Sequence, residues 1–319
     1  MTDMALEIRP YNQEDYPQLA TVLANAKPYA AVSAEILRYR DQARPAFCQF
    51  QRFVAVLDDD LVGFCLYTQY ADMFEPDAFW ADVCVSPRHQ KQGIGSALYS
   101  TLLQSLSSGR PVTLRTQIRE DDPTSIKFAQ RRGFLEFGRR WESSLDVATF
   151  DEKQFPDYKA QLKAQGIEIV SFTDLAGDPQ RDQELYQLQT ELDQDVPMLV
   201  PVTPMTFAHF SNQVLKNPAL VAGGLMIATD GNEYVGMSSL FEINPKSLVI
   251  DLTGTKAAYR RRGIAMALKL QGIVFARERG YEKIEVHNDT ANQGMIAINE
   301  RLGFVRAPAL IQYARELVP

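Results

Sequence analysis

The fold is decided by the stretch Tyr259-Arg260-Arg261-Arg262-Gly263-Ile264-Ala265-Met266. It lies between an expected strand at 248–255 and an expected helix at 264–277. The first amides of a helix have no partner inside the helix, so a strand, a short turn and a helix start together form a site for an anion. Gly263 has no Cβ, which lets a ligand oxygen lie close to the backbone. We therefore predict that this stretch binds a small anionic group.

The same arrangement occurs earlier in the chain. An expected strand at 79–85 is followed by the loop Gln90-Lys91-Gln92-Gly93-Ile94-Gly95-Ser96. Gly93 and Gly263 are 170 residues apart (263 − 93), and the Gly-Phe pairs that begin at Gly133 and Gly303 have the same spacing (303 − 133). Two landmarks at one spacing indicate an internal duplication, with chance as the alternative.

Length and charge bound the classes of function. A chain of 319 residues with 45% hydrophobic and 23% charged residues has the composition of an ordinary soluble protein with about two domains. The net charge of −7 gives no reason to expect nucleic-acid binding, whereas the local cluster Arg260–Arg262 indicates a small anion.

Cysteine content and hydropathy indicate a compartment. Cys48, Cys65 and Cys84 are odd in number and lack metal-ligand spacing, so we expect buried thiols in a reducing, cytoplasmic environment. The N-terminus has no apolar signal core, and no apolar run is long enough to span a membrane.

The order of expected elements predicts two similar modules. We place an N-terminal module at 1–150, a polar connector at 151–166 and a C-terminal module at 167–319. Each module combines strands and helices in the same order, ending in strand, loop, helix, strand, helix and strand. This order predicts a mixed α/β fold in which each module has a central mixed β-sheet flanked by helices.

The repeated motif resembles that of the GCN5-related N-acetyltransferases, the GNAT family. The shared pattern is Gln/Arg-x-x-Gly-x-Gly/Ala after a strand, with a Gly-Phe helix end 40 residues further on (133 − 93 and 303 − 263). The resemblance covers nearly the whole chain as two tandem modules. Neither half contains a Walker loop or Gly-x-Gly-x-x-Gly, so kinase and dinucleotide-binding functions lose support.

The resemblance implies acetyl-coenzyme A as cofactor, held by two loops and the strands before them. In this family the strand splays from its neighbour, the pantetheine arm pairs with its main chain, and the pyrophosphate lies on the loop amides. The cofactor-binding residues implied in this way are Val83, Val85, Gln90, Lys91, Gln92, Gly93, Ile94, Gly95, Ser96, Thr253, Thr255, Arg260, Arg261, Arg262, Gly263, Ile264, Ala265 and Met266. The alternatives are a solvated basic turn at Arg260–Arg262 and simple turn chemistry at Gly93 and Gly95.

The C-terminal module carries more of the family pattern. It has Asn288, Asn292, Met295 and Asn299, of which Asn292 and Asn299 share a helix face with Gly303. An amide there is expected to bind the pantetheine arm, although Asn292 is equally suited to cap the helix. At the 170-residue offset the N-terminal module has Ile118, Asp122, Ser125 and Ala129, which puts its catalysis in doubt.

The candidate general base is Asp251. Acetyl transfer to an amine needs a neutral amine, so a carboxylate near the thioester is suited to remove the proton. Strand alternation places Asp251 on the face of Thr253 and Thr255, although a salt-bridged or solvated aspartate is the alternative. Glu285 and His287 on the neighbouring strand are weaker candidates.

The candidate general acid is Tyr313. Many relatives have a tyrosine four residues before the helix-ending glycine, and this chain has Ala129 and Asn299 at those positions. Tyr313 on the last strand is a substitute, with a core or rim tyrosine as the alternative. The scattered histidines His89, His209 and His287 predict no metal site.

These observations predict an N-acetyltransferase that acts by direct attack of an amine on acetyl-coenzyme A, mainly in the C-terminal module. The alternative is a non-catalytic acyl-coenzyme A sensor or scaffold. The acceptor is a small-molecule or peptide amine, because small amines, amino sugars, antibiotics and protein N-termini all use this scaffold. No nucleic-acid or membrane partner is expected, and the sequence does not specify an oligomeric state.

Overall fold

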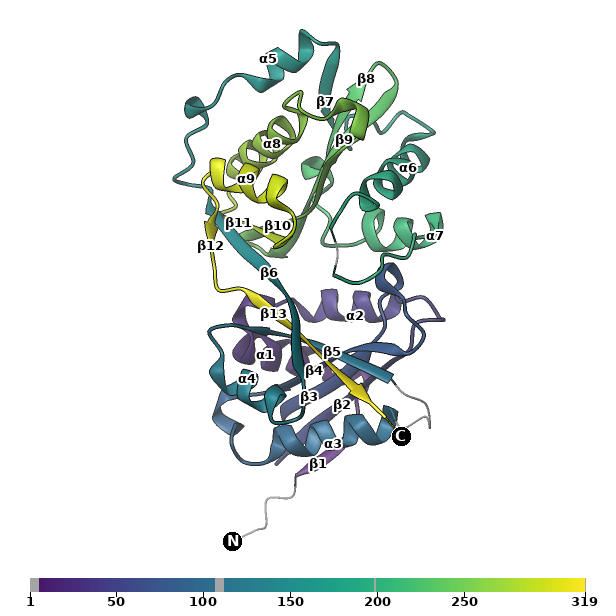
Figure 1. Ribbon diagram of the computed structural model, residues 1–319, viewed down its shortest axis with the longest axis vertical. Coiled ribbons are helices and arrows are strands. Elements are labelled where there is room, and N and C mark those ends of the chain that lie inside the picture. The colour runs from purple at the N-terminus through teal and green to yellow at the C-terminus, as the bar shows by residue number, and fades with distance from the viewer. Residues whose placement is uncertain (1–5, 107–111, 198, 319) are drawn as a thin grey trace. The chain divides into compact units, whose positions relative to one another are not determined.

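Two compact units make up the chain (Figure 1). The computed structural model describes residues 6–106, 112–197 and 199–318; the first five residues of the N-terminus therefore lie outside the described residues. Unit 1 comprises Met1–Gly138 together with Leu310–Pro319, and unit 2 comprises Arg139–Ala309. Each unit has a mixed β-sheet flanked by helices, so the predicted α/β fold class is confirmed.

Unit 1 has its sheet strands in the order β1-β2-β3-β4-β5-β13. These strands are β1 (Glu7–Pro10), β2 (Phe50–Leu57), β3 (Asp60–Thr68), β4 (Ala78–Val85), β5 (Val112–Arg119) and β13 (Leu310–Leu317). Its α-helices are α1 (Tyr16–Ala26), α2 (Ala34–Gln42), α3 (Ile94–Leu106) and α4 (Pro123–Gln130). The sheet buries α3 residues such as Leu98 on one face and α1 residues such as Leu19 on the other.

Unit 2 repeats this plan with the strand order β6-β11-β10-β9-β8-β7 and with β12 paired to β6. Its strands are β6 (Leu135–Asp146, which enters unit 2 at Arg139), β7 (Ile167–Ser171), β8 (Met226–Asp230), β9 (Glu233–Asn244), β10 (Ser247–Thr255), β11 (Lys283–Asp289) and β12 (Val305–Arg306). Its α-helices are α5 (Tyr158–Lys163), α6 (Arg181–Asp193), α7 (Phe207–Phe210), α8 (Ile264–Glu278) and α9 (Gln293–Arg301).

The two halves of the sequence exchange one strand. In unit 2, Leu145 of β6 lies opposite Ile284 of β11, and in unit 1, Arg315 of β13 lies opposite Leu114 of β5. Both members of the two pairs differ by the same 170 residues (315 − 145 and 284 − 114). β6 and β13 are therefore corresponding strands, and each completes the unit built mainly from the other half. The compact units consequently differ from the contiguous modules expected at 1–150 and 167–319.

The duplication is visible in the loop backbones. Lys91 and Arg261 both have positive φ, at 61° and 67°, and Gly93 and Gly263 have φ of 88° and 90°. Each loop leads directly into the helix that packs on its sheet, α3 in unit 1 and α8 in unit 2. The internal repeat predicted from residue spacing is thus confirmed in three dimensions.

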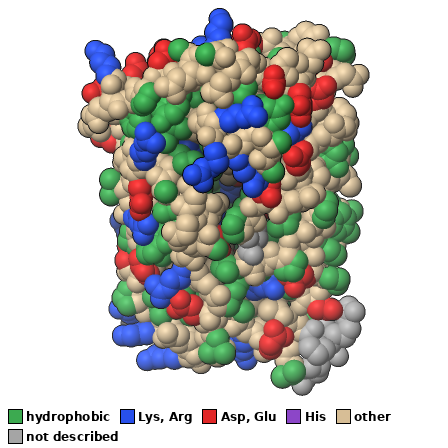
Figure 2. Space-filling model, turned by 45° about the horizontal axis from the view of Figure 1, so that its top comes forward, with side chains coloured by type: hydrophobic (Ala, Val, Ile, Leu, Met, Phe, Trp, Pro, Cys, Tyr) green, Lys and Arg blue, Asp and Glu red, His purple; other side chains and the backbone are tan. Residues whose placement is uncertain are grey.

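Several further expectations concern burial and charge. All three cysteines are buried free thiols, as predicted for Cys65 and Cys84. On the face drawn in Figure 2, lysine and arginine side chains are interspersed with aspartate and glutamate side chains. Within the described ranges, no helix has the length and apolar character needed to cross a bilayer.

Candidate functional site

The expected splay is present in unit 2. β10 and β11 are paired in parallel from Ser247 and Lys283 to Ile250 and Val286, and the ladder ends there. Beyond this point β10 pairs with β9, for example Thr255 with Gly236. The β11 side of the last part of β10 is therefore open to another chain of hydrogen-bonding groups.

Unit 1 has the same opening. β4 and β5 are paired only from Ala78 and Thr113 to Trp80 and Arg115. Further along β4, Val83 and Val85 face β3 partners on the other edge. Because the pairing ends before these two valines, the predicted backbone contacts with a pantetheine arm are geometrically available in both units.

A loop at a helix entrance follows each open strand segment. The first amide of α3 that donates to the backbone among the described residues is that of Ser96, which donates to Gly93 O at 2.9 Å. In α8 the amide of Ala267 donates to Gly263 O at 3.0 Å. Successive amides ahead of these, in a backbone with left-handed residues, form a concave site for an anion.

The loop side chains have distinct tasks. Gln90 Nε2 donates to Val85 O at 3.2 Å, and Arg260 Nε donates to Thr255 O at 3.3 Å, so both residues tie the loop to the end of its strand. Arg260 also forms an ion pair with Asp195. These contacts leave the exposed Arg261 as the arginine best placed to meet a ligand in solution.

The two glycines differ in their surroundings. A Cβ added at Gly263 would lie 3.0 Å from Cδ1 of Tyr158, whereas a Cβ added at Gly93 would meet no atom within 4 Å. Tyr158 begins α5 in the connector and packs with Ile264 and Leu268 of α8. The connector therefore supports the loop of unit 2, and no such ring lies at the loop of unit 1.

An asparagine pair lies beside the opening of unit 2. Asn299 Nδ2 donates to Asn288 Oδ1 at 2.6 Å, and Asn299 is 3% exposed. Its Oδ1 atom is buried and has no hydrogen-bond partner among the described residues, which suits a site for a ligand amide. Asn292 instead accepts from Met295 N at 3.2 Å, so it is the local helix cap that the sequence left as the alternative.

Asp251 lies where β10 leaves β11, and its side chain is exposed. The register of β10 against β9 shifts between Ile250 and Thr253, which marks a β-bulge. The bulge breaks strand alternation, so the argument that placed Asp251 on the face of Thr253 and Thr255 is wrong. The role of Asp251 as a base stays a prediction, carried now by its position at the opening.

His287 and Glu285 on β11 have different environments. Burial, reinforced by the charge of Arg140, lowers the pKa of His287 to about 4, so its imidazole is neutral at pH 7. Glu285 is 7% exposed and forms an ion pair with Lys283 at 2.6 Å. An ion-paired carboxylate and a weakly basic imidazole are poorer candidates for the base than Asp251.

The strand exchange changes the place of Tyr313. Its strand, β13, belongs to unit 1, where Tyr313 is 3% exposed in the core and lies opposite Thr116. The prediction that Tyr313 serves the C-terminal module as an acid placed it in the wrong unit. At the corresponding position of unit 2 (313 − 170) the chain has Ser143, opposite Val286.

Sequence reasoning missed an ion pair at the opening of unit 1. Lys27, at the end of α1, pairs with Asp82 on the open segment of β4. Burial lowers the pKa of Lys27, but the charge of Asp82 outweighs it and leaves this pKa above its ordinary value. Burial, together with the Asp82 charge, also raises the pKa of Cys84. No local pattern links residues 55 positions apart, so the sequence held no signal for this contact.

Comparison with known proteins gives two matches to one family. The sequence profile of the Acetyltransferase (GNAT) family matches residues 15–134 and 183–304. A mycothiol acetyltransferase of Thermobispora bispora is 23% identical over 321 residues, covering 97% of this chain and 99% of the relative. A mycothiol acetyltransferase of Corynebacterium glutamicum strain R is 30% identical over 262 residues, covering 82% of this chain and 81% of the relative.

Solved structures share the fold over the full length. A tandem GNAT protein from the clavulanic acid biosynthesis pathway superimposes with a TM-score of 0.76 at 18% identity, covering 99% of both chains. A GCN5-related N-acetyltransferase from Sphaerobacter thermophilus gives a TM-score of 0.69 at 17% identity, covering 98% of this chain and 96% of the other. The tandem arrangement predicted from the repeat is thus found in a protein of known structure.

Proposed function

Because the chain belongs to the acetyltransferase (GNAT) family, we propose that it transfers the acetyl group of acetyl-coenzyme A to the amine of a small molecule, mainly in unit 2. The observation that carries this proposal is the open segment of β10, which runs directly into a left-handed loop at the start of α8. An acyl-coenzyme A thioester has an amide-bearing arm for the first feature and a pyrophosphate for the second.

Buried polar atoms support the fit of such a ligand. Thr255 Oγ1 and Asn299 Oδ1 are both buried and lack a hydrogen-bond partner among the described residues. Thr255 ends the open strand segment, and Asn299 lies on α9 next to Asn288 of β11. A ligand arm between β10 and β11 would offer both atoms a partner, which removes the cost of leaving them unsatisfied.

The reaction needs only groups that this unit presents. When bound, the thioester supplies an activated acetyl carbon; in the transfer a C–N bond forms and the C–S bond breaks. The backbone N–H of Thr253, on the open segment, is our candidate donor to the oxygen that becomes negative. Asp251 accepts the proton that the amine loses, directly or through water. The departing sulfur takes up a proton from solvent.

Unit 2 is favoured over unit 1 by two differences. The Asn288 and Asn299 pair of unit 2 is replaced by Ile118 and Ala129 at the 170-residue offset. In unit 1, Lys27 pairs with the carboxylate of Asp82 on the open segment, so that carboxylate already has a cationic partner. These differences support a coenzyme A-binding role without turnover for unit 1.

The acceptor class is supported by the relatives. Those that match over most of their length are named mycothiol acetyltransferases, which are proteins that act on a small molecule. We therefore propose a small-molecule amine as acceptor, ahead of a peptide amine.

Replacement of Asp251 by Asn tests the proposal. With the full chain, thiol release from acetyl-coenzyme A is measured against spermidine, glucosamine, cysteine amide and an alanyl peptide. We expect D251N to lower kcat about 10²- to 10³-fold with the best acceptor, because the amine loses its base. Coenzyme A affinity, measured by calorimetry, should stay unchanged.

The matched control is D82N, which alters the corresponding open segment of unit 1 and should leave the rate intact. An unchanged rate in D251N together with a lost rate in D82N would place the chemistry in unit 1. Absence of any turnover, with coenzyme A still bound, would support the sensor or scaffold alternative for the whole chain.

A further inference from the structure

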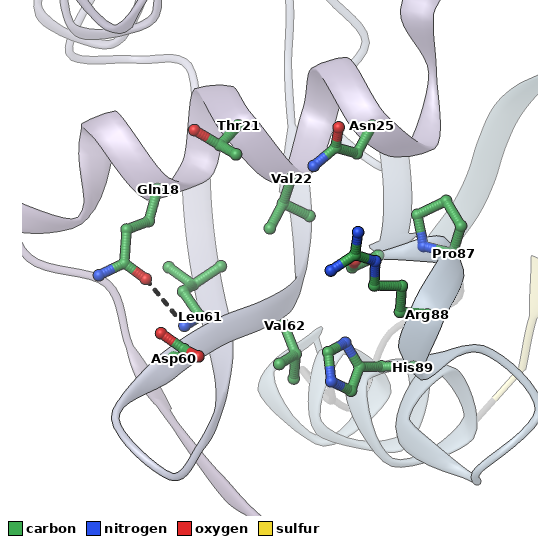
Figure 3. Close-up of a pocket in the computed structure, with 11 residues that line it drawn as sticks. Gln18, Thr21, Val22, Asn25, Asp60, Leu61, Val62, Pro87, Arg88 and His89 are labelled. Atoms are coloured by element: carbon green, nitrogen blue, oxygen red, sulfur yellow. Dashed lines mark hydrogen bonds between the residues drawn. The ribbon is translucent and has the colours of Figure 1, made fainter.

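Unit 1 contains a cavity that acetyl transfer does not use. Its volume is about 530 Å³, and it lies between α1, the start of β3 and the segment that follows β4 (Figure 3). α1 and α3 pack on different faces of the sheet, and none of the lining residues belongs to the loop Gln90–Ser96. A cavity of this size suits a small organic molecule.

Opposite charges lie at the two ends of this cavity. Figure 3 shows Asp60 at the hairpin end and Arg88 at the end below Asn25. Neither charged side chain forms an ion pair among the described residues. Beside Arg88, His89 has a buried Nδ1 atom without a hydrogen-bond partner in the same part of the chain. Gln18 is already engaged, since its Oε1 accepts from Leu61 N at 2.8 Å.

Unit 2 shows what normally fills this place. Ser86 N donates to Val62 O at 2.8 Å, and Lys256 N donates to Val235 O at 2.9 Å. Ser86 and Lys256 are also 170 residues apart (256 − 86), and each is the residue just after its splayed strand. Lys256 therefore stands in unit 2 where Ser86 stands in unit 1.

Two neighbouring positions follow the same equivalence. His89 N donates to Ser86 O at 2.8 Å, and Tyr259 N donates to Lys256 O at 2.9 Å, so Tyr259 corresponds to His89. Ala258, the residue before Tyr259, then takes the place of Arg88. Unit 1 thus has an arginine where unit 2 has a methyl group.

In unit 2 the corresponding space holds a network of ion pairs. Lys256 Nζ lies 2.8 Å from Glu233 and 3.8 Å from Glu191. Tyr259 donates to Glu233 at 3.1 Å. Glu233 begins β9, and Asp60 begins β3 at the same place in its hairpin. Unit 1 has kept the acidic residue and lost the lysine, so the Asp60 carboxylate lacks the ammonium that its counterpart has.

We propose that this cavity binds a small zwitterion of the amino-acid class. The ligand ammonium lies at Asp60, in the place that the Lys256 ammonium has in unit 2. The ligand carboxylate lies at Arg88, whose planar guanidinium pairs with carboxylates through two parallel hydrogen bonds. His89 Nδ1 and the Asn25 amide supply the remaining polar contacts, so the ligand satisfies the buried nitrogen that the protein leaves alone.

The experiment uses the full chain and defined probes. Each of the twenty proteinogenic L-amino acids is screened by thermal shift, and the best is titrated by calorimetry. We expect one saturable site for that amino acid. Its methyl ester, which lacks the carboxylate charge, and its α-keto acid, which lacks the ammonium, should each bind at least 10-fold more weakly. Absence of binding by all twenty, or equal binding of ester and keto acid, overturns the proposal.

Variants taken from unit 2 place the site. S86K installs the lysine of unit 2 and R88A installs its alanine; both should abolish amino-acid binding while coenzyme A affinity and the melting temperature stay unchanged. The matched control is K256S in unit 2, which should bind the amino acid with unaltered affinity. Binding that survives S86K and R88A, or that is lost in K256S instead, overturns the assignment to this cavity. Coenzyme A binding reports on the proposed function separately.

Discussion

Gly93 and Gly263 hold corresponding left-handed conformations at the entrances of α3 and α8. Side chains other than that of glycine rarely adopt such φ values, because the Cβ then approaches the carbonyl oxygen. Gly263 has a second constraint, since the ring of Tyr158 lies 3.0 Å from the point where a Cβ would be. The same residue type thus serves backbone conformation in unit 1 and both conformation and packing in unit 2.

This contrast predicts different costs for one substitution. G93A should lower the free energy of unfolding by about 1–2 kcal/mol, the cost of a left-handed alanine. G263A should cost more, because the added methyl group also displaces Tyr158, and it should weaken coenzyme A binding by unit 2. Urea denaturation and calorimetry check both values. Equal costs for the two variants, or an intact coenzyme A affinity in G263A, would contradict this account.

At the scale of elements, α8 is the helix that unit 2 is built around. Most of its residues are buried, from Ile264 to Ala276, and they include Lys269, which is 1% exposed. The Lys269 ammonium lies 5.7 Å from the centre of the Phe304 ring. Burial lowers the pKa of Lys269 from 10.5 to about 7, so the helix carries a basic group at a position suited to an apolar one.

The Lys269 shift predicts how stability depends on pH. Between pH 7 and about 10.5 the unfolded chain binds a proton that folded Lys269 lacks, so this group makes the free energy of unfolding rise with pH. K269M removes the effect. At pH 7 the variant should be more stable by about 1–3 kcal/mol, because the cost of burying a charge is gone. The gain should shrink toward pH 10. Thermal unfolding at both pH values tests this, and a gain independent of pH would contradict it.

At the scale of the whole molecule, the exchange of β6 and β13 makes each unit depend on both halves of the sequence. β13 completes the sheet of unit 1 beside β5 over eight residue pairs, from Leu310 with Arg119 to Leu317 with Val112. β6 does the same beside β11 in unit 2 over seven pairs. A fragment cut at the predicted module boundary therefore loses the strand that covers its fifth.

The exchange predicts the behaviour of separated halves. Fragments 1–150 and 167–319, expressed alone, should lack cooperative unfolding and coenzyme A binding, because each exposes the unpaired edge of β5 or β11. Co-expression of 1–150 with 151–319 should restore both properties, since every strand is then present. Circular dichroism on heating and calorimetry with coenzyme A check this. Stable separate fragments that bind coenzyme A would contradict it.

Local chemistry explains how much of the fold and site was predictable. The helix that begins at Ile94 was expected to reach about Leu106, where α3 ends, and the loops were identified from glycine and helix-start residues alone. The splay of β10 came from the family resemblance, and the pairing that ends at Ile250 confirms it. Where a prediction depended on regular alternation, as for Asp251, one β-bulge was enough to overturn it.

By itself the sequence determined the repeat, the order of elements, both loops and the family, because each depends on residues that are near one another in the chain. Only the tertiary structure decided the partners of β6 and β13, the unit that contains Tyr313 and the pairing of Lys27 with Asp82. The physical reason lies in the duplication. β5 and β11 present corresponding edges, and a strand that satisfies one in hydrogen bonding and alternation satisfies the other. Local pattern cannot distinguish the two partners, so the choice is made only when the whole chain packs.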